Sequence, residues 1–195
     1  MRVVRGFMGM VVVYTVIVFV IYNGIACKPK TMSSYSQYYG QDYWRTPAIR
    51  SSRWRYIIVH HSATDVGCAR SFDRYHRMVR KWKNGLGYHF VIGNGTKTPD
   101  GFVEAGHRWY YQLEGAHAGV AKYNQHGIGI CLVGNFNKTY PTERQMHALV
   151  TLVKQLHAEY GIPYENVLPH RAIKPTDCPG NNFPWEQFMN ELYTW

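Results

Sequence analysis

The stretch RYIIVHHSATD, residues 55 to 65, ends a run of β-branched residues with two adjacent histidines. Such residues favour extended backbone, so the run predicts a strand. Side chains along a strand point alternately to its two faces, which puts Ile58 with His60 and Val59 with His61. One histidine at most can therefore face a given pocket in this strand, and the period alone does not say which.

The residues after this strand alternate between helical and extended patterns. Apolar positions predict a helix over 71–82 that Ser71 caps, and a longer helix over 142–160 that opens with a Thr142/Gln145 capping box and ends at Gly161. Further strands are predicted over residues 87–93, 101–106 and 127–134. A loop rich in Pro and Gly and a short helix complete the chain. The alternation predicts a single α/β domain over 53–195, with a mixed central β-sheet flanked by helices.

The N-terminal part has a different composition. Residues 7–22 are almost wholly apolar after a basic start, which predicts that residues 1–26 are a signal peptide or a membrane anchor. Residues 27–52 are rich in Ser, Tyr and Gln and predict a linker. We therefore expect an exported protein of the cell envelope or periplasm. It would be anchored by its N-terminal segment or lipidated at Cys27, or secreted if the signal is cleaved.

The charge of the chain restricts its partners. The formal net charge is +10, from 22 basic and 12 acidic residues, which favours a polyanionic partner such as a wall polymer or a membrane surface. The sequence has no motif that reads RNA or DNA, so we expect no nucleic-acid partner. We expect the protein to be a monomer.

A second stretch, HRAIKPTDCPG at 170–180, places His170 and Cys178 in a loop that prolines stiffen. Both side chains are good Zn²⁺ ligands, and a histidine at a strand end, His60, could supply a third. Three ligands would leave one tetrahedral position for water, as in catalytic zinc sites. The chain has 10 histidines, however, so many such trios can be drawn. On spacing alone, a packing role for His170 and Cys178 is the stronger interpretation.

A family resemblance changes this balance. In order along the chain stand IIVHHSAT, GLGYHFVIG, VEAGHRW, GAHAGVAKYNQHGIGICLVGNF, PTERQM and HRAIKPTDCPG. Together these blocks resemble the zinc-dependent N-acetylmuramoyl-L-alanine amidases of the type-2 family. That family includes bacteriophage amidase lysozymes and animal peptidoglycan recognition proteins. The resemblance runs from about Trp54 to Trp185.

The resemblance implies roles for particular residues. It makes His60, His170 and Cys178 the ligands of a Zn²⁺ cofactor and Tyr88 a catalytic residue. Thr176 stands where the phage enzymes carry a lysine, and we expect its hydroxyl to donate a hydrogen bond during catalysis.

Further positions are implied less directly. His117 and Asn124 match positions that line the substrate groove in the family, although each could instead be a loop residue bonded to the backbone. Arg171 could bind a stem-peptide carboxylate or be an ordinary surface arginine. Lys174 is cationic but stands two residues before the position of the family's lysine. Glu104 is expected to have a structural or peripheral role.

The activity that the resemblance implies is hydrolysis of the amide between N-acetylmuramic acid and L-alanine in peptidoglycan. One alternative is a peptidoglycan-binding module that does not cut, although such members typically lose the cysteine that stands here as Cys178. Another is a thiol hydrolase that uses Cys178 and His170 without a metal.

Overall fold

The computed structural model describes residues 50–194. The predicted signal or anchor segment and nearly all of the linker lie outside these residues, so both stay predictions. Within residues 50–194, no helix has both the length and the apolar character needed to cross a membrane.

The described chain is built on a five-stranded sheet with the order β3-β2-β4-β1-β5. The strands are β1 (Tyr56–His61), β2 (Phe90–Ile92), β3 (Val103–Ala105), β4 (Gly127–Leu132) and β5 (Val167–Pro169). Strand β1 runs parallel to both β4 and β5, and β2 runs parallel to β4. Only β3 is antiparallel to its neighbour. The predicted α/β fold with a mixed sheet is confirmed.

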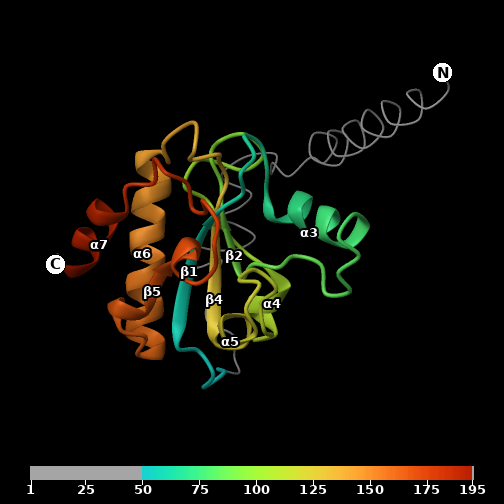
Figure 1. Cartoon of the computed structure of the whole chain (residues 1–195), viewed down its shortest axis with the longest axis horizontal. Coiled ribbons are helices and arrows are strands. Elements are labelled where there is room, and N and C mark those ends of the chain that lie inside the picture. Colours follow the sequence, from blue (N-terminus) through green and yellow to red (C-terminus); the bar gives the residue numbers. More distant parts are fainter. Residues whose placement is uncertain (1–49, 195) are drawn as a thin grey trace, which may run out of the picture.

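Helices cover the sheet from both sides. Helices α6 (Glu143–Tyr160) and α7 (Trp185–Tyr193) lie together along one side, and α3 (Ala69–Met78) lies on the opposite side (Figure 1). The shorter elements are α4 (His107–Tyr110), α5 (Ala121–His126) and the 3₁₀ turns η1 (Tyr164–Asn166) and η2 (His170–Ala172). A sheet that is covered twice needs apolar side chains on both of its faces.

Two apolar clusters meet this need. The larger one joins β1 and β4 to α6 and α7, and it takes Ile57 and Val59 from β1. The smaller one lies on the α3 side and contains Phe72, Leu86, Val91, Cys131 and Val133. His60 pairs in register with Cys131, so His60 lies on the face of the smaller cluster. Cys131 is fully buried there, as expected for a core residue.

The helix predicted over 71–82 is wrong at both ends. Helix α3 starts at Ala69, and its N-cap is Cys68, whose Sγ accepts from the N–H of Ser71 at 3.4 Å. The Ser71 hydroxyl in turn accepts from the N–H of Cys68 at 2.9 Å, so Ser71 is the third helical residue of a capping box. After Met78 the chain leaves the helix, and Trp82 folds back to stack on the ring of His76. The apolar period therefore continues past the end of the helix.

Helix α6 follows the prediction closely. Thr142 caps it, the Thr142/Gln145 capping box is formed, and Gly161 closes it with a φ of +63°. The predicted strands are present but shorter than expected. Strand β5 falls in the segment predicted to be a loop, because three residues that end in proline give no extended pattern.

Glu104 links the edge strand β3 to α3. One carboxylate oxygen, Oε1, accepts a hydrogen bond from the N–H of Ala69 at 2.8 Å, at the first residue of the helix. Burial raises the pKa of the carboxyl from 4.5 to about 7, and the hydrogen bond from Ala69 opposes this rise. The contact gives Glu104 a structural role.

The raised pKa of Glu104 predicts a pH-dependent cost to the fold. As pH rises from about 4.5 to 7, the unfolded chain loses this proton while the folded chain keeps it, so stability falls. Glu104→Gln keeps an acceptor for Ala69 but does not titrate. The difference in unfolding free energy between the variant and the parent chain should therefore increase by ~2 kcal/mol, in favour of the variant, as the pH is raised from about 5.5 to 7.5. Urea unfolding at several pH values measures this, with the exposed Glu186→Gln as control. An unchanged difference between variant and parent across this range would contradict the assignment.

Candidate metal and catalytic site

Strand register brings the two candidate histidine ligands together. In the parallel pair of β1 and β5, Val59 lies opposite Pro169. His60 follows Val59 within β1, and His170 follows Pro169 directly after the end of β5, so both histidines stand at the same carboxyl-end edge of the sheet. Cys178 reaches this edge from the loop that follows η2, and the backbone N–H of Arg171 holds the loop by bonding to the Cys178 carbonyl at 2.8 Å.

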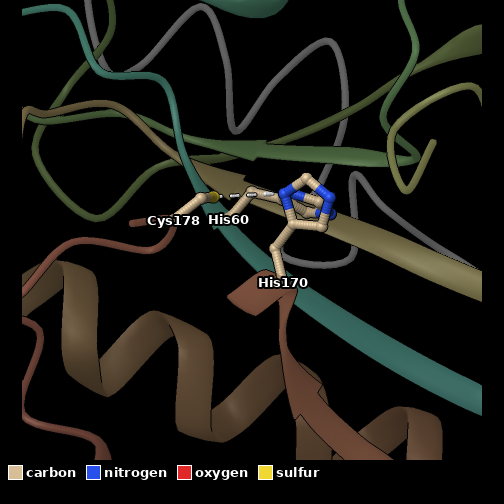
Figure 2. Close-up of side chains that lie close together, drawn as sticks. All are labelled: His60, His170 and Cys178. Carbon is tan, nitrogen blue, oxygen red and sulfur yellow. Dashed lines mark hydrogen bonds between the residues drawn. The ribbon is translucent and has the colours of Figure 1, made fainter. Parts of the chain in front are cut away.

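The three side chains form a compact cluster (Figure 2). One ligand atom from each of His60, His170 and Cys178 lies within 4.8 Å of the other two. The Sγ of Cys178 is 3.6 Å from Nδ1 of His60, and the two imidazole rings have centroids 4.5 Å apart. Two imidazole nitrogens and one thiolate are a donor set that suits Zn²⁺. The residues therefore fit the predicted ion, and their role as its ligands stays a prediction.

Burial disfavours the charged form of all three groups, including His170, whose pKa it lowers from 6.5. Desolvation lowers the pKa of His60 well below 6.5, and the neighbouring histidines lower it further. Burial raises the pKa of the Cys178 thiol to about 12, although the His61 carbonyl and the Arg171 charge oppose the rise. Such a thiol is protonated at neutral pH and is a poor nucleophile. This disfavours the thiol-hydrolase alternative, whereas a bound cation would stabilise the thiolate.

His61 points to the other face of the sheet. Its Nδ1 accepts a hydrogen bond from the N–H of Phe136 at 3.1 Å, and its ring packs on the Phe136 ring. It is 7% exposed and lies on the side of α6 and α7. The strand period thus divides the histidine pair into one candidate ligand and one packing residue.

Tyr88 stands between the cluster and a cleft. Its ring centroid is 5.3 Å from that of His60. The cleft has a volume of about 360 Å³ and is lined by Ser62, Thr64, Phe72, Tyr75, His76, Arg80, Trp82, Tyr88, Ala116 and His117. Half of these residues come from α3 and the segment that directly follows it. The apolar period that predicts a helix over 71–82 carries no signal that Tyr75 and Trp82 line a cleft.

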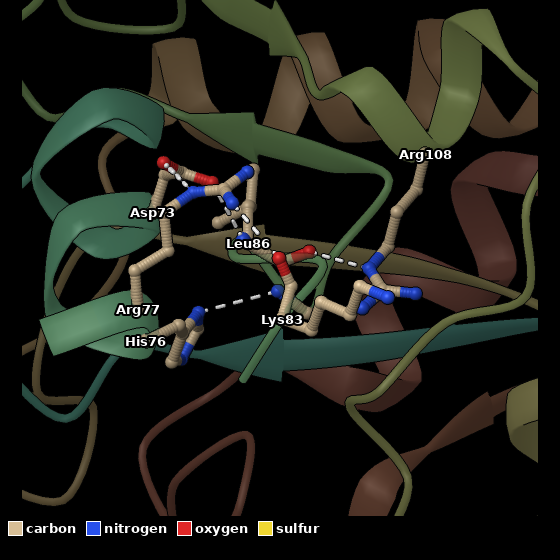
Figure 3. Close-up of polar contacts among 7 residues, drawn as sticks. Asp73, His76, Arg77, Lys83, Leu86 and Arg108 are labelled. Carbon is tan, nitrogen blue, oxygen red and sulfur yellow. Dashed lines mark hydrogen bonds and ion pairs between the residues drawn. The ribbon is translucent and has the colours of Figure 1, made fainter. Parts of the chain in front are cut away.

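The segment before Tyr88 is held by polar contacts from two helices (Figure 3). The Asp73 carboxylate accepts from the N–H of Leu86 at 2.8 Å, and Nδ1 of His76 accepts from the N–H of Gly87 at 3.2 Å. From α4, Arg108 donates to the Leu86 carbonyl at 2.6 Å. These bonds fix the backbone directly before Tyr88. The segment that places the Tyr88 side chain in the site is therefore held in position.

Two residues of the cysteine loop, the segment 170–180 that carries Cys178, make hydrogen bonds to the backbone of the loop itself. The Thr176 hydroxyl accepts from the N–H of Cys178 at 3.3 Å, and the Arg171 guanidinium donates to the Gly180 carbonyl. Both side chains are exposed, and neither is among those that line the cleft. Burial lowers the pKa of His170, and the ammonium of Lys174, which lies against Gly119, lowers it further, so a positive charge is present near the cluster.

The two predicted groove residues differ in their surroundings. Asn124 Oδ1 accepts from the N–H groups of His117 and Ala118, at 3.0 and 2.9 Å. The Asn124 side-chain oxygen is thus bonded to backbone N–H groups. This agrees with the alternative prediction that Asn124 is a loop residue bonded to the backbone. His117 lines the cleft but is only 8% exposed, and its ring is hydrogen-bonded to His60. No sequence spacing pointed to that bond.

Comparison with known proteins identifies the class. Residues 50–181 match the N-acetylmuramoyl-L-alanine amidase family (Amidase_2), and the chain belongs to this family. It is similar to an N-acetylmuramoyl-L-alanine amidase of Mus musculus, with 32% identity over 72% of this chain and 26% of that protein.

Two solved structures extend the comparison. The N-acetylmuramoyl-L-alanine amidase LysC from Clostridium intestinale URNW has 31% identity and a TM-score of 0.62, covering 77% of this chain and 95% of that one. A mutant of Drosophila PGRP-LB in complex with tracheal cytotoxin has 26% identity and a TM-score of 0.56, covering 75% of this chain and 89% of that one. The chain spans about a quarter of the length of the mammalian relatives it matches, between 23% and 26%.

The divided histidine pair predicts two different mutant phenotypes. His60→Ala removes a nitrogen from the cluster and should abolish tight zinc binding. His61→Ala should leave zinc binding intact but lower the unfolding free energy by ~1–3 kcal/mol, because the Phe136 N–H loses its buried acceptor. Zinc titration against a chelator and urea unfolding measure the two effects. Loss of zinc binding in His61→Ala alone would reverse the assignment.

Proposed function

We propose that this protein is a zinc-dependent hydrolase that cleaves the amide between N-acetylmuramic acid and L-alanine in peptidoglycan. The observation that carries the proposal is the cluster of His60, His170 and Cys178 beside the Tyr88 cleft, in a chain of the amidase family. When bound, a zinc ion would supply Lewis-acid chemistry, lowering the pKa of water toward about 7 and stabilising negative charge. His60, His170 and Cys178 would hold that ion.

Tyr88 would stabilise the transition state. Attack on an amide carbonyl places negative charge on its oxygen, and a preorganised donor near that oxygen lowers the barrier. The Tyr88 hydroxyl is the donor we assign, because its ring lies beside His60 and lines the cleft. The bonds to Leu86 and Gly87 hold the backbone before it, so little reorganisation is needed when the charge develops.

The cleft would bind the muropeptide. Aromatic and basic side chains line its α3 side, including Tyr75, Trp82 and Arg80. Aromatic rings suit the apolar faces of sugars, and a guanidinium suits peptide carboxylates. We assign a supporting role to Thr176 and Arg171, which would hold the loop that presents Cys178. A muropeptide partner is consistent with the complex of PGRP-LB with tracheal cytotoxin.

The proposal extends to location and organisation. We propose that residues 1–26 direct export or anchor the chain, that residues 27–52 are a linker, and that residues 53–195 are the catalytic domain. The net charge of +10 would favour an anionic wall near the membrane. We propose that the protein acts as a monomer.

The alternative is a module that binds peptidoglycan without cutting it. Some relatives are named peptidoglycan-recognition proteins, and the cleft by itself would serve binding. The free thiol of Cys178 within the cluster favours the enzyme, because binding alone does not require it.

Metal dependence separates the enzyme from the module. The full chain, zinc-loaded or metal-stripped, is incubated with intact peptidoglycan, and released stem peptides with new L-alanine amines are quantified. We expect release from the zinc-loaded sample alone. Cys178→Ser should lose zinc and activity together. Binding to peptidoglycan without release from either sample would leave the module as the function.

Removal of the Tyr88 hydroxyl tests its role. Tyr88→Phe should lower kcat about 10²- to 10³-fold, as expected when one donor to the developing oxyanion is lost. Zinc content and KM should change little, because the ring remains and the hydroxyl is not a ligand. Tyr75→Phe, which changes a hydroxyl in the same cleft, is the matched control. Equal effects of the two substitutions on kcat would argue against a special role for Tyr88.

A further inference from the structure

Hydrogen bonds determine which nitrogen of His117 carries a proton. Its Nε2 lies 3.2 Å from the Gly127 carbonyl, and a carbonyl oxygen can only accept. The proton is therefore on Nε2. Both rings are buried, His60 at 1% and His117 at 8% exposure, and no carboxylate of the described residues bonds to either ring, so a charged imidazole would lack a counterion and both rings are neutral. A neutral ring has one N–H, so Nδ1 of His117 is an acceptor.

The proton position on His60 follows from that of His117. Nε2 of His60 lies 3.0 Å from Nδ1 of His117. Because that Nδ1 is an acceptor, the N–H must be on Nε2 of His60. The other nitrogen of His60, Nδ1, then carries an unshared electron pair, and it faces Sγ of Cys178 at 3.6 Å. A metal ligand needs such an electron pair, directed at the ion.

We propose that His117 is a positioning residue, which holds the His60 ring in the tautomer and orientation that present Nδ1 to the cluster. The chain of bonds runs from the Gly127 carbonyl on β4 through His117 to His60 on β1, so it is anchored in two neighbouring strands. The inference rests on the metal site of the proposed function. It gives His117 a role toward the ligand His60 in place of the groove-lining role that the family resemblance implied.

The surroundings of the His117 ring support a fixed position. A β-carbon added at Gly115 or at Gly129 would lie 2.3 or 2.5 Å from Cδ2 of His117. Two glycines thus leave the space that the ring fills, and any larger residue at either position would displace it. A side chain whose task is to grip substrate would expose its polar atoms, whereas both ring nitrogens of His117 are used inside the protein.

The same loop orients the second candidate ligand. Nε2 of His170 lies 3.0 Å from the carbonyl of Ala118, so it carries the proton and leaves Nδ1 with an electron pair. Asn124 accepts from the N–H groups of both His117 and Ala118. One side chain therefore holds the two residues that fix the protons on His60 and His170. This explains why Asn124 is turned toward the backbone.

The tautomer is measurable without metal or activity. Long-range ¹H–¹⁵N NMR correlations of the metal-free full chain distinguish a protonated from an unprotonated ring nitrogen. We expect His60 to show a single form with the proton on Nε2. A proton on Nδ1 of His60 would overturn the proposal, whatever the variants show.

Substitutions at His117 test the consequence for metal binding. His117→Leu keeps the bulk but removes the acceptor, so His60 should populate both tautomers and zinc affinity should fall about 10- to 100-fold. His117→Asn returns an acceptor near the Nδ1 position and should recover most of that affinity. His157→Leu is the control, because His157, which lies on α6, also bonds a backbone carbonyl, that of Ile162. It should leave zinc affinity and the His60 tautomer unchanged.

One outcome of the His117 substitutions would refute the proposal. If His117→Leu keeps the parent's zinc affinity and His60 tautomer while KM for peptidoglycan rises, then His117 is a substrate contact and the proposal fails. If that variant does not fold, the NMR of the parent chain and of His117→Asn decides. Failure of the parent chain to bind zinc would refute the proposed function instead, while the tautomer measurement on metal-free protein would still stand.

Discussion

The pairing of β1 with its two parallel neighbours is the constraint on which the rest of the structure depends. Ile57 opposite Ile128 and Val59 opposite Ile130 lock the register, because their side chains are buried against α6. A slip of one residue would reverse every side chain of β1. His60 would then enter the main core and His61 would face the cysteine loop. The position of the candidate metal cluster is therefore a consequence of apolar packing on the opposite face of the sheet.

Burial sets the chemistry of the cluster once the register has placed it. Imidazoles and thiols removed from water are held neutral, and each buried polar atom needs a partner. The Ala118 carbonyl is the partner of Nε2 of His170, and His117, itself bonded to the Gly127 carbonyl, is the partner of Nε2 of His60, so the Nδ1 atoms of His60 and His170 are left for the cluster. A thiol with a pKa of about 12 can become a thiolate here only with a cation beside it. Binding of a metal ion would therefore be coupled to the protonation of these groups.

The parts of the fold that were predicted well have strong local signals. Helix α6 carries its own capping box at Thr142 and its own stop at Gly161, and β1 has a continuous β-branched run. The end of α3 was missed because its apolar period continues to Trp82, which stacks on His76 instead of extending the helix. Strand β5 was missed because three residues that pair with β1 become a strand only through that partner.

The sequence by itself determined the alternation of helices and strands, the order of motifs that gives family membership, and the residue types of the candidate cluster. These properties are local, or they are read in order along the chain. Tertiary structure alone decided which nitrogen of each histidine faces the cluster, and that Asn124 and Arg171 support backbone. Such contacts join residues far apart in sequence, 57 positions for His60 and His117 and 118 for His60 and Cys178. No local pattern encodes them, because their geometry exists only after the sheet has formed.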